Sequence, residues 1–244
     1  MQSEIFLARI ADTVDICEKT NKPKFLGFLS LEEAVFAEKI LENKKASYSF
    51  FGGYDEAERI MLGCFPEYIT EQKFPITAIT FSFRKEYNLT HRDFLGSLMA
   101  LGIGRETVGD ILVEPERAVA FVTNDIADYI LNEVKKIGRV GVSVSISAKF
   151  PLPSKSSLAE FSCTVASGRL DSVVASLCNF SRNEASQKIA LGLVSVNSVQ
   201  TEKSTKQISG GDVITVRGKG KFIIESLCDK TRKNRIVLKY KKYI

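Results

Sequence analysis

The sequence predicts an α+β protein, with helices and strands mixed along a chain of 244 residues. Apolar residues change several times between helical spacing and strict alternation, which indicates both kinds of element. The segment 149–160 contains two prolines and three serines and has the composition of a linker. The charge of the chain differs strongly on the two sides of this segment. We therefore expect three domains, 1–72, 74–148 and 161–244, of which the last two are joined by the linker.

The first region, 1–72, is predicted to be mostly helical with a short strand pair. Apolar residues recur at helical spacing over 5–16 and indicate an opening helix. Ser30 favours the start of a second helix, because its hydroxyl can cap free N–H groups and the glutamates that follow it suit the helix dipole. A strand is expected at 47–51, and a third helix from Asp55.

The middle region is predicted to follow the order β-α-β-β-α-β, which is typical of ferredoxin-like and RRM-like domains. Phe81, Phe83 and Phe121 lie on its expected strands. Such side chains can stack on RNA bases, but single aromatic residues on strands are more often part of a core, and we favour the core. The expected strands are 76–83, 110–113, 118–122 and 140–146, and the expected helices are 94–101 and 124–137.

The last region begins with two predicted helices and continues as a strand meander. Leucines and valines within 170–177 recur at helical spacing and form one apolar stripe. Ser181 with Glu184 three residues later is a capping box, so a second helix starts at Arg182, and Gly192 ends it. The expected strands are 194–196, 213–216, 222–227 and 235–240, the last two joined by the basic loop 229–234.

The net charge of +5 hides an asymmetry. Residues 1–160 contain 19 Lys and Arg against 23 Asp and Glu, a net charge of −4. Residues 161–244 contain 15 against 6, a net charge of +9. A basic C-terminal third on an acidic body is typical of a protein that binds a polyanion, although a solvated basic surface gives the same count.

Cysteine, histidine and hydropathy patterns argue against several other classes of protein. The five cysteines are scattered and form no CxxC pair, so we interpret them as reduced thiols of a cytoplasmic protein. His91 is the only histidine, and the sequence predicts neither a metal site nor a cofactor. The longest nearly apolar run, 95–103, is too short to span a bilayer, and the N-terminus lacks the pattern of a secretion signal.

Four fragments of the last region, in this order and spacing, resemble the S-four RNA-binding domain: 168–171, 181–185, 192–197 and 211–217. The resemblance implies that structured RNA is the partner. It also implies RNA contacts from Arg169, Arg182, Asn183, Gln187 and Lys188 on the helical face, and from Lys203, Lys206, Arg217, Lys219 and Lys221 on the strand side.

Four further groups of residues stand out along the chain: 50–54 with 57–59, 91–96, 101–106 with 109–111, and 217–220. Together with the four fragments, they make nearly the whole chain resemble the YlmH family of bacterial S-four proteins. The resemblance implies a cytoplasmic protein without catalytic activity that binds ribosomal RNA on the large ribosomal subunit. It further implies a part in ribosome-associated quality control, in which a stalled chain on peptidyl-tRNA is extended and cleared. Transfer RNA is a further candidate partner, and we expect a monomer.

Two other functions remain open at this point. The segment 168–171 also matches the short motif that carries the catalytic aspartate of some pseudouridine synthases, so Asp171 could belong to an RNA-modifying enzyme. Against this, Asp171 falls in the first turn of a predicted helix, where the helix dipole favours a carboxylate. The second alternative is an interaction scaffold linked to cell division that uses the acidic N-terminal region. Tyr54 and Arg59 could present a surface to a ribosomal partner or belong to a structural turn, and we favour the turn.

Overall fold

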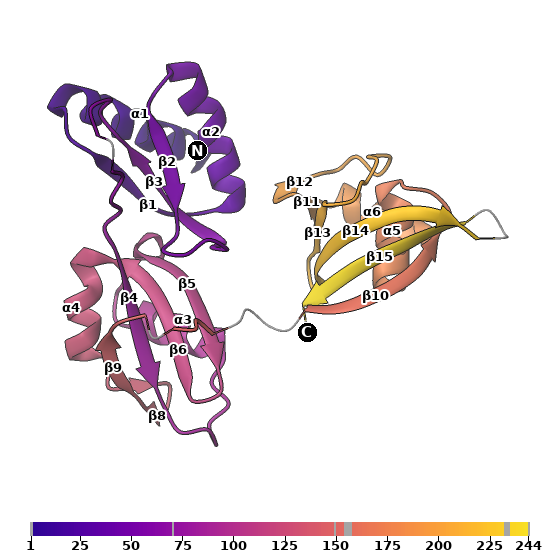
Figure 1. Cartoon of the computed structure of the whole chain (residues 1–244). Coiled ribbons are helices and arrows are strands. Elements are labelled where there is room, and N and C mark those ends of the chain that lie inside the picture. Colours follow the sequence, from indigo (N-terminus) through magenta and orange to yellow (C-terminus); the bar gives the residue numbers. More distant parts are fainter. Residues whose placement is uncertain (1, 70, 149, 154–157, 232–234, 244) are drawn as a thin grey trace. The chain divides into compact units, whose positions relative to one another are not determined.

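The computed structural model of the protein describes residues 2–69, 71–148, 150–153, 158–231 and 235–243. The chain forms two compact units, Met1–Lys155 and Ser156–Ile244 (Figure 1). Each unit has its own buried apolar core. Both contain helices and strands, which confirms the predicted α+β class.

Two helices and a three-stranded sheet form the N-terminal part of the first unit. The elements are α1 (Gln2–Thr20), β1 (Lys24–Ser30), α2 (Leu31–Lys44), β2 (Tyr48–Phe51) and β3 (Arg59–Cys64). The second helix begins as predicted. The Ser30 hydroxyl accepts the N–H of Glu33 at 3.2 Å, and the Glu33 carboxylate accepts the N–H of Ser30 at 2.7 Å. Ile10 of α1, Leu41 of α2 and Leu62 of β3 meet in the core between the helices and the sheet.

The predicted third helix from Asp55 is wrong, because Arg59–Cys64 forms the strand β3. This strand is the central one of the sheet, paired with β1 on one side and with β2 on the other, and its last four residues are buried. A short apolar run without alternation does not distinguish a buried strand from a helix. Pairing with two neighbours makes it a strand here, and the region has three strands in place of the predicted pair.

The middle part of the first unit has the predicted order β-α-β-β-α-β. Its elements are β4 (Ile76–Ser82), α3 (His91–Ala100), the 3₁₀ helix η1 (Arg105–Thr107), β5 (Val108–Glu114), β6 (Arg117–Thr123), α4 (Asn124–Glu133), β7 (Lys136–Ile137), β8 (Val140–Gly141) and β9 (Ser143–Ile146). Four of the strands form an antiparallel sheet in the order β5-β6-β4-β9.

The end of this part differs from the prediction. Helix α4 ends at Glu133 rather than Ile137, and the expected strand 140–146 is divided into β8 and β9. Ile137 pairs with Val140 in a two-residue hairpin. Gly138 adopts φ +57 in the turn, a conformation that glycine tolerates and that such tight turns require. The helix expected to reach residue 137 therefore gives way to this hairpin.

Both faces of the four-stranded sheet are covered. On one face, α3 and α4 pack against buried side chains that include Phe81 and Phe83. On the other face, Phe121 packs in a cluster with Phe28 and Met61 of the three-stranded sheet. Phe81, Phe83 and Phe121 are therefore all buried. Their predicted place in the core is confirmed, and the base-stacking interpretation is wrong.

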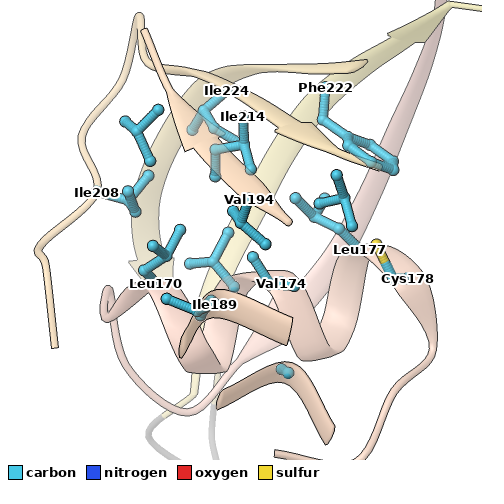
Figure 2. Close-up of a cluster of buried hydrophobic side chains, with 14 of the residues drawn as sticks. Leu170, Val174, Leu177, Cys178, Ile189, Val194, Ile208, Ile214, Phe222 and Ile224 are labelled. Carbon is cyan, nitrogen blue, oxygen red and sulfur yellow. The ribbon is translucent and has the colours of Figure 1, made fainter. Parts of the chain in front are cut away.

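The second unit is a six-stranded antiparallel sheet with two helices on one face (Figure 1). Its strands follow the order β10-β15-β14-β13-β11-β12. The elements are β10 (Leu158–Val165), α5 (Leu170–Cys178), α6 (Arg182–Ala190), β11 (Val194–Val196), β12 (Val199–Gln200), β13 (Val213–Val216), β14 (Gly220–Lys230) and β15 (Ile236–Tyr243). Figure 2 shows how Leu170 and Val174 of α5, Ile189 of α6, and Ile214 and Phe222 of the sheet converge in one core.

Both helices of this unit follow the prediction closely. The Ser181 hydroxyl accepts the N–H of Glu184 at 3.1 Å at the start of α6. Gly192 adopts φ +66 just after the end of α6, as expected for a residue that stops a helix.

The predicted linker 149–160 is too long at its C-terminal end. Residues 158–160 already belong to β10, where Leu158 pairs with Tyr243 of β15. Of the remaining predicted linker residues, 149 and 154–157 lie outside the described part of the chain. The hairpin of β14 and β15 is confirmed with longer strands than expected, and residues 232–234 of its basic loop also lie outside the described residues.

Candidate nucleic-acid interface

The carboxylate of Asp171 brings two of the predicted RNA-binding arginines together. Arg169 is the N-cap residue of α5 and Arg182 is the first residue of α6. Both donate to the carboxylate of Asp171. Arg169 donates through Nε at 3.2 Å to Oδ1 and through Nη2 at 2.9 Å to Oδ2, and Arg182 donates through Nε at 3.2 Å to Oδ2. The N–H of Ser172 adds a fourth bond at 2.8 Å.

The Asp171 carboxylate is buried and charged. Its side chain is 4 % exposed, against 35 % for Arg169 and 56 % for Arg182. Burial alone would raise the pKa of Asp171, but the hydrogen bonds from Arg169, Arg182 and the Ser172 N–H outweigh it and lower that pKa below its ordinary value. The hydrogen bond to Asp171 in turn raises the pKa of Arg169. A buried anion thus holds two guanidinium groups whose remaining N–H groups reach the surface, where they can bind phosphate.

The loop after β12 completes this end of the helix pair. The Lys206 carbonyl accepts the N–H of Leu170 at 2.8 Å, and the Ser204 carbonyl accepts the N–H of Asp171 at 3.1 Å. The backbone that carries Lys203 and Lys206 therefore lies against the first turn of α5. The structure brings these two predicted lysines close to the arginine pair through the backbone of their loop.

Three lysines lie close to Phe180, in the turn between α5 and α6, and to Phe222 of β14. The Nζ atoms of Lys188 and Lys219 both lie 5.0 Å from the centre of the Phe180 ring, and Lys242 Nζ lies 5.5 Å from the Phe222 ring. Cation–π contacts of this length are favourable and hold the ammonium groups near the aromatic surface.

The pKa of the nearby Cys178 thiol is affected by the same three lysines. Burial raises this pKa, while the charges of Lys219, Lys242 and Lys188 oppose that rise. The sequence analysis missed Lys242. The alternation of β15 contains the signal, since Leu238, Tyr240 and Lys242 share one face of the strand.

The remaining predicted contacts are spread more widely. Asn183 and Gln187 are exposed on α6, and Arg217 is exposed in the turn between β13 and β14. Lys221 precedes the buried Phe222 on β14, so it lies on the sheet face away from the helices. The structure thus groups Arg169 with Arg182 and Lys188 with Lys219, but it does not bring Lys221 to the helical face.

In the first unit, the motif residues around Tyr54 and Arg59 build a buried polar network. The carboxylate of Asp110, itself 8 % exposed, accepts the Tyr54 hydroxyl at 2.6 Å and the backbone N–H groups of Glu58 and Arg59 at 2.7 and 3.1 Å. Burial, and then Asp110, raise the pKa of Tyr54. The Tyr54 ring also stacks on Phe121 at 4.9 Å.

The Arg59 guanidinium bonds to backbone carbonyls of three segments. It donates to the carbonyls of Phe28 at 2.7 Å, Val108 at 3.0 Å and Arg105 at 3.2 Å. These hydrogen bonds connect the three-stranded sheet to η1 and β5. They confirm the structural interpretation of this turn, and they explain why the motif needs an arginine whose several donors can serve several carbonyls at once.

No group of three or more His, Cys, Asp or Glu side chains within the described residues could hold a metal ion. No helix in the part of the chain that the structure describes is long and apolar enough to cross a membrane.

Comparisons with known proteins add independent information. The family described as "Putative RNA-binding domain in YlmH" matches residues 70–149, the β-α-β-β-α-β part. The ribosome-associated protein quality control protein P2 of Bacillus subtilis is 30% identical over 234 residues, which cover 94% of this chain and 91% of that protein. The structure of the cell division protein ylmH from Streptococcus pneumoniae aligns with a TM-score of 0.53 at 24% identity, covering 60% of this chain and 92% of that one, and shares the fold.

Proposed function

The chain belongs to the YlmH family, and from this premise we propose that it is a non-catalytic RNA-binding protein that acts on the ribosome. In this proposal residues 158–243 form an S-four RNA-binding domain. Its RNA is ribosomal RNA of the large subunit, with peptidyl-tRNA as a further contact, and its task is the quality control of stalled ribosomes. The relative from Bacillus subtilis bears a name with the same task.

The pair of arginines held by Asp171 is the observation that carries the proposal. A guanidinium group has five donors in a planar fork, and the carboxylate of Asp171 occupies only some of them. Because the anion is buried and the arginine side chains are partly exposed, donors that Asp171 does not occupy are available to a ligand. Charged donors of this kind position phosphate groups of RNA.

The environment of Asp171 also favours binding over catalysis. A carboxylate that acts as nucleophile or base must reach a substrate atom. Here the carboxylate is 4 % exposed and bonded to two arginines and a backbone N–H. These contacts support a structural role, in which Asp171 orders the cations, and they disfavour the RNA-modifying enzyme as the alternative.

The proposal is tested by the affinity of the full chain for bacterial large ribosomal subunits, with Arg182→Ala as the informative variant. We expect this variant to bind roughly five- to tenfold more weakly, because loss of one phosphate contact costs about 1 kcal/mol and lowers the salt slope by about one. The matched control is Arg9→Ala, since Arg9 is an exposed arginine of a helix in the acidic first unit. Equal affinities of two folded variants would contradict the placement of the RNA surface.

A further inference from the structure

The helix side of the β-α-β-β-α-β part contains an open groove of about 650 Å³. It lies between α3 and the segment that joins α4 to the hairpin of β7 and β8. Arg92 projects from the first turn of α3 on one side, and Lys135 and Lys136 stand on the other. Glycine, serine and alanine of α3 and Gly138 of the hairpin turn lie between these cations. A Cβ atom added at Gly96 or Gly138 would meet nothing within 4 Å, so the groove is open to solvent there.

The family that matches this part of the chain is described as an RNA-binding domain. The structure limits which surfaces of this part can bind RNA. Domains of this topology often stack bases on aromatic side chains of the sheet. In this protein the sheet face opposite the helices is buried against the three-stranded sheet, with Phe121 and Val119 packed against Phe28 and Met61. RNA bound by this part must therefore use the helix side or an edge.

The cations beside the groove are free to bind an anion. Arg92, Lys135, Lys136 and the hairpin residue Arg139 are exposed, and none of them forms an ion pair or a side-chain hydrogen bond within the described residues. Asp93, which also lines the groove, is engaged with its own helix. Its carboxylate accepts the N–H and the hydroxyl of Thr90, both at 2.7 Å.

Glu133 is the other acidic side chain of the groove. Three lining cations, Arg92, Lys135 and Lys136, against these two carboxylates, one of which caps a helix, leave a positive surface in a unit whose sequence is acidic as a whole.

We propose that this groove is a second RNA-binding site, which takes the phosphate backbone of an RNA duplex. The residues that line the groove favour a duplex over a single strand. None of the described residues that line the groove is aromatic, so it has no platform on which unpaired bases could stack. Small residues between cations instead allow the backbone of a helix to approach closely. The inference rests on the proposed function and adds to it that the first unit holds RNA independently of the arginine pair.

The test uses the full chain with Lys135→Ala and Lys136→Ala combined. Its binding to a short synthetic RNA duplex and to large ribosomal subunits is measured as a function of salt. We expect about tenfold weaker binding to both and a salt slope lower by roughly 1.5, from 0.7 to 0.9 for each lost phosphate contact. The melting temperature should be unchanged, because both side chains are exposed.

The matched control is the combination Lys22→Ala and Lys39→Ala, which removes two exposed lysines of the same unit away from the groove and should bind like the wild type. Wild-type affinity and salt slope in the groove variant, together with weakened binding of Arg182→Ala, would overturn the groove site and leave the proposed function intact. Weaker binding to subunits with unchanged binding to the duplex would indicate an acidic protein partner and would also overturn it. Wild-type binding by all variants would contradict the proposed function itself.

Discussion

At the residue scale, the informative feature is a buried carboxylate that orders two surface cations. The sequence predicts that Asp171 lies in the first turn of a helix, and the structure places it in the first turn of α5. The sequence does not predict the contact with Arg182, which is eleven positions away along the chain. That contact depends on the angle between α5 and α6, which tertiary packing sets. Local pattern therefore predicted the position of Asp171, and three-dimensional packing determined its partners.

Asp171→Asn should destabilise the protein by about 1.5–3 kcal/mol, the range for hydrogen bonds to a charged group. Asparagine retains a carbonyl acceptor but loses the charge and the second acceptor oxygen. The arginines stay partly solvated, so the loss should not reach the larger cost of isolating a buried charge. The measurement is urea-induced unfolding of both proteins near pH 7. A difference below about 0.5 kcal/mol would show that the ion pairs contribute little.

The same variant has a pH signature. The pKa of Asp171 is lowered in the folded protein, so its ion pairs contribute stability above the unfolded value of about 3.9. That contribution is lost as the pH falls through the folded pKa. The stability difference between wild type and Asp171→Asn should therefore be constant between about pH 5 and 8 and should shrink below about pH 4. A difference that persists unchanged into acid would contradict the lowered pKa.

At the element scale, local signals predicted the helices that form, added one from Asp55 that does not, and missed several strands. Ser181 and Gly192 mark the two ends of α6 in the sequence, and the structure places both where their chemistry requires. Strand β3 and the whole of strand β10 were missed, for two different reasons. The short apolar run of β3 does not alternate, so its pattern does not distinguish a buried strand from a helix. In β10, Leu158 pairs with Tyr243 at the far end of the unit, and a pairing across such a sequence distance leaves no local pattern to read.

The turn between β11 and β12 offers a prediction at this scale. Asn197 and Ser198 both have positive φ, +52 and +63, and such a conformation strains a serine more than a glycine. Ser198→Gly should stabilise the protein by up to about 1 kcal/mol, since the relief of about 1–2 kcal/mol is partly offset by the greater freedom of glycine in the unfolded chain. Ser198→Val should destabilise it, because a β-branched residue is still less compatible with this conformation. Thermal unfolding of the two variants checks the order, and a more stable valine variant would refute it.

At the scale of the whole molecule, charge is divided between two units with separate cores. Residues 161–244 carry a net charge of +9 and residues 1–160 a net charge of −4. The charge count alone favours the second unit as the main RNA-binding unit. It could not predict the groove beside α3, because the cations there are diluted by acidic residues elsewhere in the first unit and are gathered only by the fold.

The second unit should bind RNA by itself. A fragment that begins at Ser156 retains all of β10, whereas one that begins at Phe161 would remove the first residues of that strand and its pairing with β15. We expect the longer fragment to keep most of the affinity for ribosomal RNA. With about five or six phosphate contacts, its affinity should fall roughly a hundredfold or more between about 50 and 200 mM salt. Finding nearly all affinity in residues 1–155 would contradict the assignment of the main RNA surface.

Crosslinking of the full chain to cellular RNA by ultraviolet light tests the central claim most directly, when both the RNA positions and the crosslinked peptides are mapped. The account predicts crosslinks to ribosomal RNA of the large subunit, with most of the peptides from the second unit around α6 and the turn between β13 and β14. It also predicts that Arg182→Ala reduces their yield while Arg9→Ala does not. Crosslinks absent from ribosomal RNA, or confined to peptides of the first unit, would contradict it.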